Sequence, residues 1–115
     1  MTKENNAHKR ALEKIAANPE KFGFEHIVYV SIEPSLYANG RGIIAQPDIV
    51  FESSKHEIYI IEYKGNGDEE LMKTARRQLD NAVWWYGRYR TDISPENINT
   101  TIISGTDQKY KELLR

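Results

Sequence analysis

The segment Ile58-Tyr59-Ile60-Ile61-Glu62-Tyr63-Lys64 places the strongest limit on how this chain can fold. Its residues are mostly β-branched or aromatic, which is typical of a strand. Side chains alternate between the two faces of a strand, so Glu62 and Lys64 share one face with two isoleucines, and the tyrosines share the other face with Ile61. Because both faces are largely apolar, we expect a central strand that is covered on both sides.

A second apolar stretch, Ile49-Val50-Phe51, precedes this segment, and the polar residues 52–56 between the two predict a turn. If the two strands form a hairpin, Asp48 at the start of one lies near Glu62 and Lys64 at the end of the other. Charges at the end of a buried strand are costly unless they are paired or bind a metal. We therefore expect these three side chains to form a polar site at one edge of the sheet.

Two converging carboxylates make an all-oxygen site, which Mg²⁺ or Mn²⁺ prefers over Zn²⁺, and the backbone carbonyl of Tyr63 would complete the protein ligands. A metal held there polarises a phosphate and lowers the pKa of a bound water. Lys64 beside that water would orient it or stabilise the charge of the transition state. This set suits phosphodiester hydrolysis. The alternative is structural: Glu62 and Lys64 form an ordinary ion pair on a strand face, and Asp48 only starts a strand.

Residues 2–18 predict a first helix, rich in Ala, Glu, Lys and Leu and ended by Asn18-Pro19. At 100° per residue, its inward stripe contains Glu4, His8, Ala11, Leu12 and Ile15, whereas Glu13 points to solvent. Glu4 is either a further acid of the site or an ordinary acid in a first helical turn. His8 is interpreted as a partly buried helix histidine.

A second helix is predicted from a cap at Asp68 to about Arg90. Gln78 lies in the middle of its apolar side, where it bonds backbone or reaches into a site. That side consists of Leu71, Ala75, Gln78, Leu79, Ala82, Trp85, Tyr86 and Tyr89. The opposite side carries Lys73, Arg76, Arg77, Trp84 and Arg88. This basic face with an outward Trp84 suits a phosphate backbone and a base, or a partner protein, or is an ordinary solvated face.

Further strands are expected at residues 26–33 and 98–104, with a loop through Gly40-Arg41-Gly42 after the first and a final helix over residues 107–115 capped by Thr106. The order is helix, three strands, helix, strand, helix. The crossover helix implies that the last strand is parallel to the one that holds Lys64. The fold class is α/β, a mixed central sheet flanked by helices.

Composition limits the function classes. The 115 residues are enough for a single domain, residues 1–115, and the absence of cysteine excludes disulfides and thiolate metal sites. No apolar run approaches the length of a membrane span and the N-terminus is not a signal peptide, so we expect a cytoplasmic protein. The net charge of −1 means that nucleic-acid binding would depend on a local basic face.

The spacing Pro47-Asp48, thirteen residues, Glu62-Tyr63-Lys64 resembles the motif of the PD-(D/E)XK nuclease superfamily. The order of elements is similar to the αβββαβ restriction-endonuclease-like core of that superfamily over nearly the whole chain. Within the superfamily, the chain most resembles the small Holliday-junction-resolvase-like members. The resemblance implies a Mg²⁺-dependent DNA endonuclease in which Asp48 and Glu62 hold the metal and Lys64 serves the water. It also implies that Glu4 and Gln78 belong to the catalytic site. A homodimer and the absence of a small-molecule cofactor are further implications.

Two alternatives from other classes stay open. The first is a nuclease-like fold that binds nucleic acid or assembles with proteins without catalysis. The second is a protein-interaction domain that docks a partner through Trp84. The residues do not distinguish DNA from RNA, or branched from linear substrates.

Overall fold

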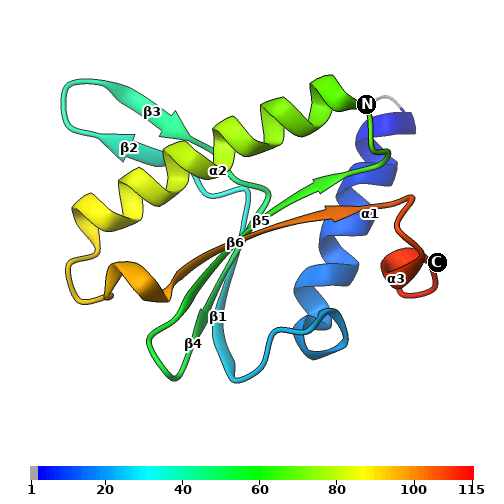
Figure 1. The fold of residues 1–115 in the computed structure, drawn as a ribbon, viewed down its shortest axis with the longest axis horizontal. Helices are drawn as coiled ribbons and strands as arrows, with labels where there is room; N and C mark the ends of the chain where they lie inside the picture. The colour runs from blue at the N-terminus through cyan, green and yellow to red at the C-terminus, as the bar shows by residue number, and fades with distance from the viewer. Residues whose placement is uncertain (1–2) are drawn as a thin grey trace.

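The computed structural model describes the backbone of residues 3–115 and the side chains of residues 6–115 (Figure 1). In chain order its elements are α1 (Lys3–Ala17), the 3-10 helix η1 (Pro19–Phe22), β1 (Ile27–Ile32), β2 (Leu36–Ala38), β3 (Gly42–Ala45), β4 (Ile49–Ser53), β5 (Ile58–Lys64), α2 (Glu69–Tyr89), the 3-10 helix η2 (Pro95–Asn97), β6 (Ile98–Ser104) and α3 (Gln108–Lys111). The predicted α/β class and mixed sheet are confirmed.

The main sheet has the strand order β1-β4-β5-β6. Strands β1, β4 and β5 are antiparallel neighbours, and β6 runs parallel to β5, with Lys64 beside Ser104. Strand β5 is therefore central, and Ile58, Ile60 and Ile61 on its two faces are fully buried, as its sequence predicts. Helix α2 makes the crossover between the two parallel strands (Figure 1).

Two apolar clusters cover the two faces of the sheet. On one face, Leu12 and Ile15 of α1 pack with Phe51 of β4 and Tyr110 of α3. On the other face, Leu79, Ala82 and Tyr86 of α2 pack with β4 and β5. Residues of β4 alternate between these clusters, Phe51 in the first and Val50 in the second, because successive side chains of a strand point to opposite faces. The molecule is a sandwich of helix, sheet and helix.

The segment between β1 and β4 differs from the prediction. In place of the expected loop, β2 and β3 form a separate antiparallel hairpin. Leu36, Ala38 and Ala45 are buried, and Leu36 and Ala45 belong to the cluster beneath α2. Gly40 allows the tight reversal because its φ of +74° is costly for other residues. The glycines that predicted a loop are the turn of a hairpin that packs on α2.

Two further details of the prediction are wrong. The final helix is shorter than residues 107–115 and is capped by the side chain of Asp107, which accepts from the Lys109 N–H at 2.9 Å, and not by Thr106. Leu71 and Tyr89, predicted on the buried side of α2, are 39% and 38% exposed. Both lie near the ends of a helix that, at 1.5 Å per residue, is longer than β5, so its terminal turns extend past the sheet.

Within the described part of the chain, no helix combines the length and the apolar character that crossing a membrane requires.

Candidate active site

The structure brings Asp48 and Glu62 together. Ile49 of β4 pairs with Ile61 of β5, so Asp48, one residue earlier, lies beside Glu62, one residue later. The Oδ2 atom of Asp48 accepts a hydrogen bond from the Tyr63 N–H at 2.7 Å. The carbonyl oxygen of Asp48 accepts one from the Glu33 N–H at 2.8 Å, so the backbone and the side chain of Asp48 are both held.

Glu62 is a buried acid, only 2% exposed. Burial, followed by a hydrogen bond and charge repulsion from Asp48, raises the pKa of Glu62 to about 9, although the nearby charge of Lys64 acts in the opposite direction. Without a bound cation, Glu62 therefore keeps its proton at neutral pH. The structure thus places a buried carboxyl group with a raised pKa beside a second carboxyl group at this end of the sheet.

Lys64 ends β5 on the same face as Glu62, and its side chain is partly buried. The Gly105 N–H donates to the Lys64 carbonyl at 2.8 Å and fixes this end of the strand. None of the ion pairs in the described part of the chain joins Lys64 to Glu62. The side chains of Lys64 and Glu62 are therefore not in direct ionic contact, although the charge of Lys64 acts on Glu62.

The carbonyl of Tyr63 has the orientation that a ligand of the site requires. The N–H and C=O groups of one residue point to the same side of a strand, and the Tyr63 N–H points to Asp48. The pairing of β4 with β5 reaches Ile61 but not Tyr63, so β4 supplies no ladder partner for this carbonyl.

Helix α1 places His8 beside Asp48, whereas the sequence pattern predicts only a partly buried helix histidine. Its Nε2 atom lies 3.4 Å from Oδ1 of Asp48, and its ring centroid lies 5.7 Å from that of Tyr63. Its place on the inward stripe of α1, one turn after Glu4, was the available signal. Glu4, the acid expected on this stripe, has its side chain outside the described residues.

No hydrogen bond among the described residues joins the Gln78 side chain to Asp48 or Glu62. Its Oε1 atom accepts from the Gln46 N–H at 3.2 Å. The Gln46 side chain in turn donates to the Glu33 carbonyl and to the Ser35 hydroxyl, each at 3.2 Å. Gln78 thus fixes the backbone two residues before Asp48, which is the first of the two roles expected for it.

The predicted basic face of α2 lies on the surface. Lys73, Arg76, Arg77 and Arg88 are exposed, and Trp84 is 46% exposed. The Nζ atom of Lys73 lies 3.7 Å from Oε1 of Glu70, and the surrounding solvent weakens this ion pair. The sequence did not indicate Arg41, whose guanidinium carbon lies 5.9 Å from the centroid of the Trp84 ring.

The donor set at this edge of the sheet suits a hard cation. Asp48, Glu62 and the Tyr63 carbonyl offer only oxygen atoms, the preference of Mg²⁺ and Mn²⁺. Among the described side chains no group of three or more His, Cys, Asp or Glu residues has metal-binding geometry. A cation here would therefore use two carboxylates with backbone and water, as Mg²⁺ commonly does.

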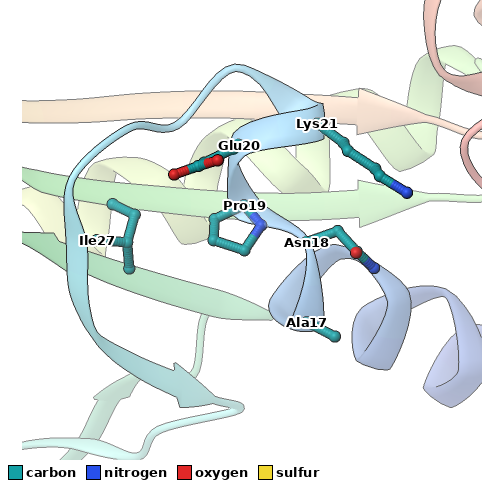
Figure 2. Close-up of a pocket in the computed structure, with 6 residues that line it drawn as sticks. All are labelled: Ala17, Asn18, Pro19, Glu20, Lys21 and Ile27. Carbon is teal, nitrogen blue, oxygen red and sulfur yellow. The ribbon is translucent and has the colours of Figure 1, made fainter.

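A separate hollow of about 310 Å³ lies at the other end of α1 (Figure 2). It is lined by Ala17, Asn18, Pro19, Glu20, Lys21 and Ile27. Figure 2 shows the Glu20 and Lys21 side chains pointing in opposite directions. Because Ala17 follows His8 by nine residues, this hollow lies about 13 Å along α1 from the contact with Asp48, and it is not part of the site.

No protein-family model matches the chain, and no curated protein matches it significantly.

Proposed function

We propose that the protein is a divalent-metal-dependent nuclease that hydrolyses DNA phosphodiester bonds. The observation that carries this proposal is the position of Asp48 beside the buried Glu62, whose pKa is raised first by burial and then by Asp48, so that the charged form of Glu62 carries an energetic cost. Such a cost is expected where a cation site is prepared, because the cation removes the repulsion.

In this proposal Asp48 and Glu62 hold the metal, Mg²⁺ or Mn²⁺, together with the Tyr63 carbonyl. The metal would polarise the scissile phosphate and acidify a bound water. Lys64, on the same strand face as Glu62, orients the attacking water and stabilises charge on the phosphate. Gln78 holds the backbone that leads to Asp48, and the hydrogen bond from Tyr63 fixes the Asp48 carboxylate.

We infer that the core is restriction-endonuclease-like. Support comes from the order α1, β1, β4, β5, α2, β6, which follows the αβββαβ order of that core when the β2–β3 hairpin is taken as an insertion. The exposed cations on α2 would contact the phosphates of the DNA, which supports nucleic acid as the substrate.

The test is cleavage of labelled single-stranded, duplex, flap and four-way-junction DNA, with Mg²⁺, with Mn²⁺ or with EDTA. We expect metal-dependent cleavage of at least one substrate. Lys64→Ala should lower its rate by at least about 100-fold, the usual contribution of a positioned acid or base. Binding without cleavage would point to an inactive nucleic-acid module, and full activity in Lys64→Ala would overturn the role of this lysine.

We further propose that two copies assemble through β1, one of the two edge strands of the main sheet. Four of its residues, Val28, Tyr29, Val30 and Ile32, are 44–67% exposed. The strand carries no charge or proline, which commonly protect exposed edges. Antiparallel pairing of this edge with a second copy would form a closed two-fold interface in which no like charges meet.

For this assembly we expect the wild-type protein to migrate as a dimer and Val30→Lys as a monomer, because the new charges would face each other across the two-fold axis. Light scattering after size exclusion measures both masses. Ile43→Lys, the same change at an exposed position of β3, is the control and should stay dimeric. A monomeric wild type, or a dimeric Val30→Lys, would contradict the interface.

A further inference from the structure

Helix α2 presents one exposed stripe that the proposed catalytic role does not use. Arg77, Asn81, Trp84 and Arg88 follow one another at spacings of four, three and four residues, which places them on one side of a helix. All four are exposed. The stripe combines two cations, an amide and an indole ring.

The β2–β3 hairpin flanks this stripe and is held in place by two contacts with α2. The indole N–H of Trp85 donates to the Tyr37 carbonyl at 2.7 Å, and the Asn39 N–H donates to the Tyr89 hydroxyl at 3.3 Å. The hairpin thereby brings Arg41, with its guanidinium carbon 5.9 Å from the ring centroid, to Trp84. Figure 1 shows the hairpin beside α2.

Between the hairpin and the stripe lies an open hollow of about 390 Å³, lined by Arg41, Ile43, Ile44, Asn81 and Trp84. Its volume is in the range of small-molecule sites. An indole face with aliphatic neighbours offers a stacking platform, Asn81 offers both a donor and an acceptor, and Arg41 offers a positive charge. None of the described residues that line the hollow is an acid; Asp80, the nearest acid in sequence, lines a different hollow with Arg76 and Thr101.

We propose that this hollow binds an unpaired nucleobase of a DNA strand, stacked on Trp84, with the neighbouring phosphates on Arg41 and Arg88. The aromatic ring, the amide and the positive charges match a base with its phosphates. A base within a duplex is covered on both faces by its neighbours and cannot use this platform. The inference names the substrate class of the proposed nuclease, and so rests on that function.

Helix α2 connects the hollow with the edge of the sheet that holds Asp48 and Glu62. Gln78 bonds the backbone two residues before Asp48, and Trp84 follows Gln78 by six residues, which is about 9 Å along the helix axis. This axial separation alone spans two or three nucleotides of a stacked strand, and the backbone from Gln46 to Asp48 adds to it. We therefore infer that the substrate contains a single-stranded segment a few nucleotides from the bond that is cut.

The test is binding measured in EDTA, so that cleavage plays no part. A labelled single-stranded DNA should quench the emission of Trp84 in the wild-type protein. Trp84→Ala should remove the quenching and weaken single-strand binding at least about tenfold, whereas Trp84→Phe should keep most of the affinity. The affinity of both variants for a blunt duplex should differ from that of the wild-type protein by less than about twofold. Circular dichroism verifies that both variants are folded.

Arg41→Ala provides a second, independent variant. It should weaken single-strand binding and reduce its salt dependence, and the matched control Lys55→Ala, in the turn between β4 and β5, should not. Equal losses on single strand and duplex in Trp84→Ala, or no loss on either, would overturn the proposal. Quenching by thymidine monophosphate as strong as by the strand would also overturn it, in favour of a free nucleotide.

Failure of this inference is distinguishable from failure of the proposed function. If the protein binds single-stranded DNA through Trp84 but cleaves no substrate, the base-binding site is supported and the nuclease function is refuted. Metal-dependent cleavage with unchanged binding in Trp84→Ala would keep the nuclease and refute the base site.

Discussion

Asp48→Asn is expected to lower the rate of DNA cleavage about 10⁴-fold. The amide has the size of the carboxyl group but no negative charge, so it no longer attracts a divalent cation, whose stabilisation of the transition state is worth several kcal/mol. The new side chain keeps an oxygen that can accept the Tyr63 N–H, now bonded at 2.7 Å, so the site should keep its shape. Cleavage rates at saturating Mg²⁺ measure the effect.

The matched control for this change is Asp92→Asn. Asp92 is an exposed acid that pairs with Arg90, and Arg90 would keep its second partner Glu52 at 2.7 Å. This variant should retain wild-type activity. If Asp48→Asn cleaves DNA at more than a tenth of the wild-type rate while remaining folded, Asp48 does not hold the metal.

Glu62→Gln is expected to make the protein more stable at neutral and mildly alkaline pH. The pKa of Glu62 is about 9 in the folded protein, above its ordinary value of 4.5. Between these values the unfolded chain has released the proton and the folded chain retains it. The free energy of unfolding therefore falls as pH rises, by at most about 1.4 kcal/mol per pH unit from this group. Because glutamine does not titrate, the Glu62→Gln variant should not show this fall in the free energy of unfolding with rising pH.

Denaturant unfolding at pH 5, 6, 7 and 8 without divalent cations measures the difference. Glu13→Gln, at an exposed position of α1, is the control and should keep the wild-type slope. Adding Mg²⁺ at pH 8 should stabilise the wild-type protein and leave Glu62→Gln nearly unchanged, because binding to the folded state alone raises stability. A Glu62→Gln variant that is several kcal/mol less stable than wild type at pH 8 would instead indicate that Glu62 is a structural partner.

Local sequence patterns predicted the elements that carry strong periodicity. Residues 58–64 and 98–104 form strands as predicted, and α2 begins after the Asp68 cap, whose side chain accepts from the Glu70 and Leu71 N–H groups. The parallel pairing of β5 with β6 followed from the crossover helix. The β2–β3 hairpin was missed because its strands are three and four residues long, too short for a clear alternation, and are stabilised by α2.

In the candidate sites, too, local contacts could be predicted from the sequence and long-range contacts could not. The proximity of Asp48 and Glu62 was predictable because a short antiparallel hairpin fixes which residues lie opposite each other. Other contacts join residues that are far apart in the chain. His8 and Asp48 are 40 positions apart, Gln46 and Gln78 are 32 apart, and Arg41 and Trp84 are 43 apart. These contacts depend on how α1, α2 and the hairpin dock, and no local periodicity encodes that docking.

Side-chain alternation and short connections are local properties, so the α/β class, the central strand and the neighbouring carboxyl groups at its end could be read from the sequence. The burial of Glu62 without direct ionic contact to Lys64, the bond of Gln78 to the backbone before Asp48, and the approach of Arg41 to Trp84 at a hollow became visible only in the folded molecule. Burial and side-chain partners arise when elements distant in the chain pack together, and packing is a property of the folded surfaces and not of any one segment.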